Sequence, residues 1–184
     1  MSIKLYRHQE LALNYLRMNN CFALFMEQGT GKTVTALFRV AELYKEGKIE
    51  ICLVVCPKPV IGSWWRDIPL VNEYHGVKLE NVVEVTNYEQ LLTKSGRSKY
   101  MDKKWDCIIL DESHYIKNRS AKRTKACLQL GLNAKYKYIL TGTPISNGQL
   151  ENIYSQFTFL YPYKNKQWIH SKIFGTWTDF IKEY

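Results

Sequence analysis

Residues 107–114 read Cys-Ile-Ile-Leu-Asp-Glu-Ser-His, an apolar run that ends in two adjacent carboxylates. The apolar half shows no alternation of polar and apolar side chains, which predicts a strand buried on both faces. Asp111 and Glu112 follow at its carboxyl end, where a charged pair is costly to bury unless a cation lies beside it. A solvated acidic turn is the alternative interpretation of such a pair.

Similar apolar runs alternate with helical patterns along the whole chain. Strands are predicted at 21–26, 51–56, 82–85, 105–110 and 136–140, and helices at 10–18, 32–44, 60–68, 88–93, 121–130 and 150–160. The helix at 60–68 is expected to end before Pro69, and the basic stretch 94–104 to be a mobile loop. This alternation predicts an α/β fold with a mainly parallel central sheet, in which ligands bind at the carboxyl ends of strands.

The composition is that of a soluble globular domain, with 184 residues, 46% hydrophobic and 23% charged. No stretch approaches the roughly 20 apolar residues that span a bilayer, and the amino terminus has no apolar signal core. The five cysteines lack a partner pair at zinc spacing and are interpreted as buried thiols in a reducing compartment. The net charge of +9 suits a polyanion such as nucleic acid, although it would also serve solubility alone.

Residues 26–33, Met-Glu-Gln-Gly-Thr-Gly-Lys-Thr, lie between a predicted strand and a predicted helix. Gly29, Thr30 and Gly31 would form a tight turn whose N–H groups face an anion at the start of the helix. Lys32 would reach the β- and γ-phosphates of a nucleotide, and the Thr33 hydroxyl would ligate Mg²⁺. The general phosphate-loop pattern has glycine where Met26 stands, so a glycine turn with an incidental lysine is the alternative.

With a phosphate loop upstream, the acidic pair gains a specific interpretation as part of an ATP site. Asp111 would help to hold Mg²⁺, and Glu112 would orient or deprotonate the attacking water. His114 would couple this site to motion or to a second ligand. Thr141 and Thr143, around a glycine at the end of the fifth strand, would sense whether ATP is intact. The Gln9 amide would pair with the edge of adenine.

In their order along the chain, these motifs resemble those of superfamily-two helicases, most closely the SWI/SNF-like (chromatin-remodeller type) DNA translocases. The remodeller form of the phosphate loop also lacks the first glycine, so Met26 fits it. The resemblance covers the Q motif, with Arg7 and Gln9 (6–9), motif I (29–33), motif Ia (54–57), motif Ib (86–88), motif II with its tail (111–118), and motif III with the helix after it (140–147 and 150–154).

The resemblance implies a RecA-like three-layer sandwich at 1–162, the first motor lobe, with 163–184 as an extension toward a second lobe. It places Pro57, Lys58, Thr86 and Tyr88 near a DNA strand, through sequence-independent, salt-sensitive backbone contacts. A second RecA-like domain, in cis or in trans, would supply the arginine fingers. Without them the chain is expected to be a poor ATPase, because a missing arginine finger costs ~10³–10⁵ in rate.

Two functions therefore remain open at the level of sequence. The first is the ATP-binding half of an ATP-driven, DNA-dependent helicase or duplex translocase, and the second is a non-catalytic nucleic-acid-binding module that keeps the motor fold. Compact spacing between the motifs favours a bacterial or viral source and a cytoplasmic location, with a nuclear one if the source is eukaryotic.

Overall fold

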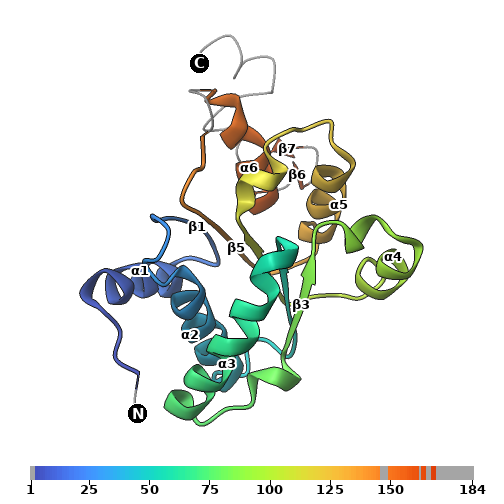
Figure 1. Ribbon diagram of the computed structural model, residues 1–184. Helices are drawn as coiled ribbons and strands as arrows, with labels where there is room; N and C mark the ends of the chain where they lie inside the picture. Colours follow the sequence, from blue (N-terminus) through green and yellow to red (C-terminus); the bar gives the residue numbers. More distant parts are fainter. Residues whose placement is uncertain (1–2, 146–148, 162, 165–166, 169–184) are drawn as a thin grey trace.

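A five-stranded parallel sheet forms the centre of the molecule (Figure 1). The computed structural model describes residues 3–145, 149–161, 163–164 and 167–168. The strand order β1-β5-β4-β2-β3 and the parallel pairing confirm the predicted α/β fold. The strands are β1 (Cys21–Phe25), β2 (Cys52–Cys56), β3 (Val83–Asn87), β4 (Cys107–Asp111) and β5 (Tyr136–Thr141).

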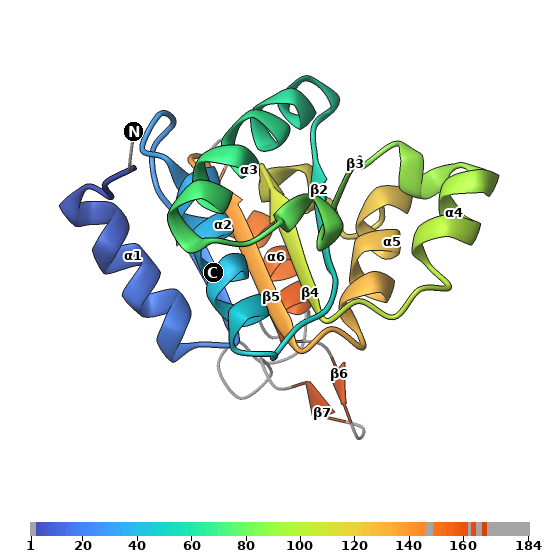
Figure 2. The same ribbon diagram turned by 90° about the horizontal axis from the view of Figure 1, so that it is seen from below.

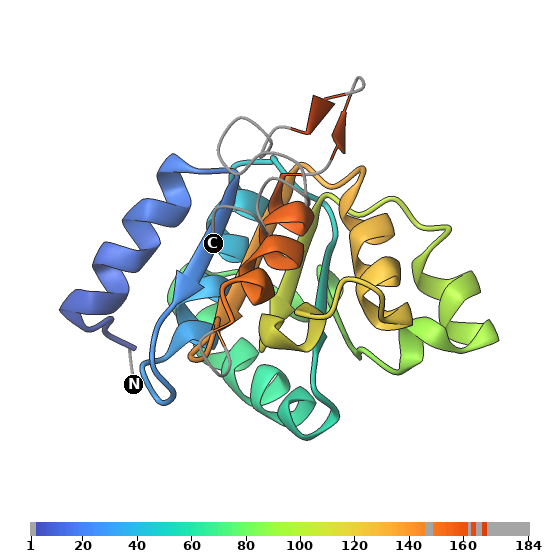
Figure 3. The same cartoon turned by 90° about the horizontal axis from the view of Figure 1, so that it is seen from above.

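Helices cover both faces of the sheet, as Figures 2 and 3 show from opposite sides. One layer consists of α1 (Arg7–Met18), α2 (Lys32–Lys45) and α3 (Ile61–His75), and the other contains α5 (Lys122–Gly131) and α6 (Glu151–Leu160). The remaining elements are α4 (Lys94–Tyr100), a hairpin of β6 (Tyr163–Lys164) and β7 (Gln167–Trp168), and four 3-10 turns: η1 (Lys58–Val60), η2 (Leu79–Asn81), η3 (Gln90–Leu92) and η4 (Ser113–Ile116).

The central strands contribute side chains to two separate hydrophobic cores, one on each face of the sheet. In β2, Cys52, Val54 and Cys56 pack against the α1–α3 layer, whereas Leu53 and Val55 pack against the α5–α6 layer. Burying each Val or Leu side chain contributes ~1.5–3 kcal/mol, so an apolar run without alternation is stable only in a sheet covered on both faces.

Helix α3 continues through Pro69 to His75, so the prediction that it ends before Pro69 is wrong. A proline inside a helix costs ~3 kcal/mol because it removes a hydrogen bond and crowds the preceding turn. Ile68 and Val71, on either side of it, are buried in the core shared with α2, and this burial offsets the cost. The helix ends instead at Gly76, which adopts a left-handed conformation.

The basic stretch after η3 forms helix α4 over Lys94–Tyr100, so the prediction of a loop over 94–104 is also wrong. The Thr93 hydroxyl caps the helix by accepting a hydrogen bond from the Gly96 amide at 2.9 Å. The buried rings of Tyr100 and Trp105 anchor its far end. Trp105 lies one residue beyond the basic stretch, and Tyr100 is the single aromatic residue within it, so the composition of 94–104 does not reveal the anchor that the two rings form together.

Four of the five cysteines are buried free thiols, as predicted, and the fifth, Cys21, is half-buried. Within the described ranges, no group of three His, Cys, Asp or Glu side chains is arranged to hold a metal ion. In the same part of the chain, no helix combines the length and apolar character needed to cross a membrane.

Candidate nucleotide site

The predicted phosphate loop connects β1 to α2 at the carboxyl edge of the sheet. Gly29 and Gly31 have φ angles of 77° and 79°, a region that side-chain-bearing residues rarely adopt. Gly31 is the N-cap of α2, and no side chain caps that helix. The N–H groups of the first turn of α2 therefore offer donors to an anion.

Lys32 lies inside the loop and is only 8% exposed. Its ammonium group donates hydrogen bonds to the main-chain oxygens of Met26 and Glu27, both at 2.9 Å. These bonds hold the loop in a curved shape around the lysine. A bound phosphate would compete with the two carbonyl oxygens for the same ammonium group.

Gln9 ties the start of α1 to the phosphate loop. Its Oε1 accepts from the Tyr6 amide at 2.9 Å, and its Nε2 donates to the Thr30 main-chain oxygen at 3.1 Å. A Cβ added to Gly31 would lie 2.0 Å from Gln9 Nε2 and would push the Gln9 amide away from the Thr30 oxygen, and the φ of 79° itself favours glycine. Gln9 lies within α1, whereas it was predicted to precede that helix, and its pairing with adenine stays a prediction. Arg7 is exposed at the first position of α1.

Asp111 is the last residue of β4, and its side chain is buried, 4% exposed. Its Oδ2 accepts from the indole Nε1 of Trp64 and its Oδ1 from the Glu112 amide, each at 2.9 Å. Burial raises the pKa of Asp111, while the Trp64 hydrogen bond and the charge of Lys32 act to lower it. Lys32 is therefore near enough to Asp111 for its positive charge to favour the ionised carboxylate.

Trp64 was not among the predicted site residues. It is fully buried on α3, and an apolar ring at helical spacing is typical of a core residue. Nothing local in the sequence marks its N–H as the donor to a carboxylate 47 residues away.

Glu112, the predicted water-handling residue, has a φ of 50°, the one positive value outside glycine in the described part of the chain. Its Oε2 lies 3.2 Å from His114 Nδ1 and accepts from the Thr141 hydroxyl at 3.3 Å. His114 Nδ1 also lies 3.1 Å from Thr141 Oγ1, which in turn accepts from the Thr143 amide at 3.1 Å. The structure thus brings the predicted coupling residues into one network with Glu112.

Burial lowers the pKa of His114 below its usual 6.5, and the neighbouring Glu112 opposes this shift. His114 is therefore mainly neutral near pH 7. A neutral imidazole both donates and accepts hydrogen bonds, which allows it to exchange partners within this network.

The oxygen ligands at this edge suit Mg²⁺ better than a softer metal. Asp111 contributes a carboxylate and Thr33, which is half-buried at the start of α2, contributes a hydroxyl. Each Asp111 oxygen accepts one described hydrogen bond, which leaves lone pairs for a cation. Two protein ligands are typical of Mg²⁺ sites that are completed by nucleotide phosphates and water.

The residues predicted to touch DNA divide into two groups. Lys58 is exposed at the first position of η1, after the buried Pro57, beside a groove of about 370 Å³. Thr86 and Tyr88 are buried, 3% and 0% exposed, so their side chains offer almost no surface to DNA, and their position near a DNA strand stays a prediction.

Tyr88 instead holds the main chain at Asp111 in the candidate nucleotide site. Its hydroxyl donates to the Asp111 main-chain oxygen at 2.8 Å, and its ring stacks on Tyr115 with centroids 5.2 Å apart. The groove next to Lys58 is lined by Pro57, Lys58, Pro59, Asn87, Glu89, Gln90 and Tyr115. A contact with DNA at this edge would therefore use the surface of that groove.

The amino-acid sequence matches a known protein family. A sequence profile described as the SNF2-related domain matches residues 70–182. The chain belongs to the SNF2-related domain family. The match extends beyond residue 162, and the predicted division of the chain at that point stays a prediction.

Relatives of this SNF2-related domain include a human protein and a plant protein. Human chromodomain-helicase-DNA-binding protein 7 is 27% identical over 95% of the chain, and Arabidopsis thaliana protein CHROMATIN REMODELING 24 is 29% identical over 86% of it. The chain spans only 6% and 17% of these two proteins. They give no support to the predicted bacterial or viral source or to a cytoplasmic location.

Solved structures of the same family share the fold. The SWI2/SNF2 ATPase core of Sulfolobus solfataricus in complex with dsDNA is 26% identical, with a TM-score of 0.79, and covers all of this chain and 39% of its own. The same core domain solved on its own gives a TM-score of 0.74. These likenesses confirm the predicted RecA-like fold and the resemblance to SWI/SNF-like translocases of superfamily two.

Proposed function

We propose that this SNF2-related domain is the ATP-binding and ATP-hydrolysing half of a DNA-stimulated helicase or duplex translocase. The proposal rests on one observation: the phosphate loop and the Asp111–Glu112 pair lie at the same edge of the sheet. The charge of Lys32 acts to lower the pKa of Asp111 there, and Glu112 is held by His114 and Thr141.

Each side chain has a distinct role in the proposed reaction. The loop amides and Lys32 bind the phosphates, while Thr33 and Asp111 hold Mg²⁺, which neutralises phosphate charge when it is bound. Glu112 orients water and accepts its proton. The hydrogen bonds from Thr141 and His114 fix the Glu112 carboxylate at the end of β4, where that water would approach.

DNA is the proposed polyanionic partner. The Sulfolobus solfataricus ATPase core was solved with dsDNA, and this chain has the same fold and a net charge of +9. In our proposal, backbone phosphates contact the surface near Lys58 without reading sequence. A second RecA-like domain, in cis or in trans, supplies the arginine finger, so the chain alone hydrolyses ATP weakly.

Replacing Lys32 with alanine tests the nucleotide site. Mg-ATP at about 100 times its Kd should stabilise the wild-type chain by ~2.7 kcal/mol, and the Lys32→Ala variant should lose this protection against heat. Lys45→Ala is the matched control, because Lys45 ends the same helix and also donates to a main-chain oxygen, that of His75 at 3.0 Å. It should keep full protection.

Hydrolysis and DNA binding complete the test. With the second domain present, Lys32→Ala should abolish DNA-stimulated ATP hydrolysis, and wild-type activity in that variant would refute the proposal. Melting without nucleotide shows whether the loss of the two loop hydrogen bonds has unfolded the chain. Tight DNA binding by a wild-type chain that Mg-ATP does not stabilise would favour the non-catalytic nucleic-acid-binding module.

A further inference from the structure

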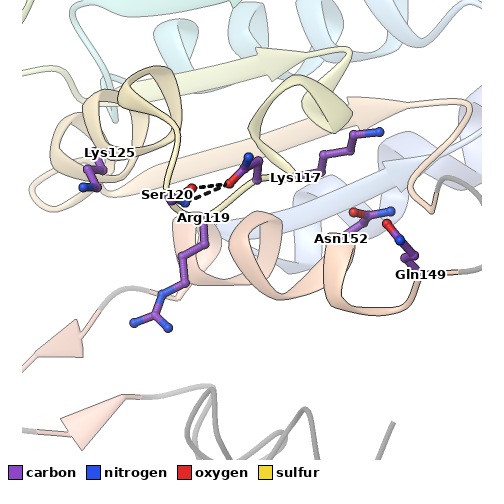
Figure 4. Close-up of a pocket in the computed structure, with 7 residues that line it drawn as sticks. Lys117, Arg119, Ser120, Lys125, Gln149 and Asn152 are labelled. Atoms are coloured by element: carbon purple, nitrogen blue, oxygen red, sulfur yellow. Dashed lines mark hydrogen bonds between the residues drawn. The ribbon is translucent and has the colours of Figure 1, made fainter.

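A polar groove of about 680 Å³ lies on the α5–α6 side of the molecule (Figure 4). It is formed by the turn between η4 and α5 together with the first turns of α5 and α6. We call it the turn groove. Its lining consists of Lys117, Asn118, Arg119, Ser120, Lys125, Gln149 and Asn152. All seven are polar or cationic, and neither the phosphate loop nor the Asp111–Glu112 pair belongs to it.

The turn groove is strongly basic. Residues 117–125 contain five lysines and arginines and no acidic residue, and 149–152 contain one acid, Glu151. The side chains of Lys117, Arg119 and Lys125 are all exposed. The amino ends of α5 and α6 also face this region, and their dipoles add positive potential to that of the side chains. A ligand for this surface should therefore be anionic.

The backbone of the turn is fixed before any ligand binds. Asn118 Oδ1 accepts from the Ser120 amide at 3.0 Å and from its hydroxyl at 2.8 Å, as Figure 4 shows. The Asn118 main-chain oxygen accepts from Thr124 Oγ1 of α5 at 2.6 Å, and that of Lys117 from Ser155 Oγ of α6 at 3.5 Å. Because both helices hold the turn, binding there would cost little backbone entropy.

Residues close together in the sequence line the turn groove and the groove beside Lys58. Tyr115 lines the Lys58 groove, and Lys117, two residues later, lines the turn groove. Arg123 lies over the Tyr115 ring at 5.6 Å, and its guanidinium group is 4.0 Å from the carboxylate of Glu89, which also lines the Lys58 groove. This ion pair offsets the one acidic group in the described lining of the Lys58 groove.

We propose that the turn groove is a second contact for the phosphate backbone of nucleic acid, distinct from the nucleotide site and from the Lys58 surface. The proposal rests on the proposed function for the identity of the polymer. An acidic protein segment is the competing ligand, but docking of peptides depends on pockets for apolar or aromatic anchors, and in the part of the chain that the structure describes no apolar or aromatic residue lines the turn groove. Cations interspersed with amides and a hydroxyl match phosphate oxygens instead.

The test compares two double variants with the same change in charge. Arg119→Glu with Lys125→Glu alters the turn groove, and Lys78→Glu with Lys135→Glu alters exposed lysines just before η2 and β5, at the opposite edge of the sheet. Each lowers the formal charge from +9 to +5, so any effect of bulk charge is matched. Lys58→Glu is the third variant, and melting curves verify that all are folded.

The affinity of the full chain for a fluorescent DNA duplex is measured by anisotropy at several salt concentrations. The turn-groove variant should lose about two units of the slope of log K against log salt, and roughly tenfold in affinity per lost contact at about 0.1 M salt. This loss should be the same for unrelated DNA sequences. The Lys78/Lys135 control should show a much smaller change.

Four outcomes would overturn the inference. Equal losses in the two double variants would reduce it to bulk charge, and weaker binding of poly-glutamate with unchanged DNA binding would assign the turn groove to an acidic protein. Loss of affinity in Lys58→Glu but not in the turn-groove variant would refute the second contact and leave the proposed function intact. A wild-type chain that binds no DNA would refute both.

Discussion

The hydrogen bond from Trp64 to Asp111 should make the stability of the chain depend on pH in a specific way. Trp64→Phe keeps an aromatic ring in the core but removes the N–H that donates to Asp111 Oδ2 at 2.9 Å. Hydrogen bonds to charged groups contribute ~1.5–3 kcal/mol and those to neutral groups ~1 kcal/mol. The part that depends on ionisation is therefore about 0.5–2 kcal/mol.

The sign follows from linkage. The Trp64 hydrogen bond lowers the folded-state pKa of Asp111, against the larger rise that burial causes. Its stabilising contribution is therefore present when Asp111 is ionised and is lost as the pH falls through the folded pKa, which lies above the usual 3.8. The smaller ring also leaves a cavity that costs about 1–2 kcal/mol at every pH.

Urea unfolding between about pH 4 and pH 8 measures both parts. The deficit in unfolding free energy of Trp64→Phe should be largest near pH 8 and up to about 0.5–2 kcal/mol smaller at the acidic end. Trp105→Phe is the matched control, because the Trp105 indole is equally buried but donates to the neutral Tyr100 oxygen at 2.9 Å. A pH-independent deficit in Trp64→Phe, parallel to that of Trp105→Phe, would refute the reasoning.

Two further predictions concern the loop and Glu112. Gly31→Ala places a Cβ 2.0 Å from Gln9 Nε2 at a φ of 79°, so it should lower the melting temperature and abolish protection by Mg-ATP. Gly47→Ala is the control, because Gly47 has a φ of 64° and open space around it; this variant should lose only ~1–2 kcal/mol through backbone strain and keep the protection. Equal effects of the two variants would contradict a special role for the Gln9 contact. Glu112→Gln keeps the shape of the side chain and removes its capacity to accept a proton, so nucleotide binding should persist while hydrolysis in the two-domain protein falls ~10²–10⁴-fold, and a full hydrolysis rate would exclude Glu112 as the base.

Local patterns were sufficient to predict the sheet and the phosphate loop. The apolar runs at Cys52–Cys56 and Cys107–Asp111 have no competing polar periodicity, and they form strands within one or two residues of the predicted bounds. Gly29 and Gly31 were expected to turn the chain, and both have positive φ angles. In each case a few adjacent residues carry the whole signal.

The features that the sequence did not reveal depend on contacts between distant segments. Trp64 and Tyr88 meet Asp111 across 47 and 23 residues, and neither contact leaves a local pattern. Helix α3 passes through Pro69 because burial against another helix outweighs a local preference. Tertiary packing therefore accounts both for the unexpected support of Asp111 and for the burial of Thr86 and Tyr88.

The left-handed backbone of Glu112 has a consequence for engineering the chain. A side chain at a φ of 50° stores ~1–2 kcal/mol that glycine would release, so selection for thermal resistance alone would favour glycine at this position. Such a protein would melt later and lack the carboxylate to which His114 and Thr141 bind. Variant libraries designed to raise the thermal stability of this domain should therefore keep residue 112 constant, since under the proposed function the most stable variants would lose ATP hydrolysis.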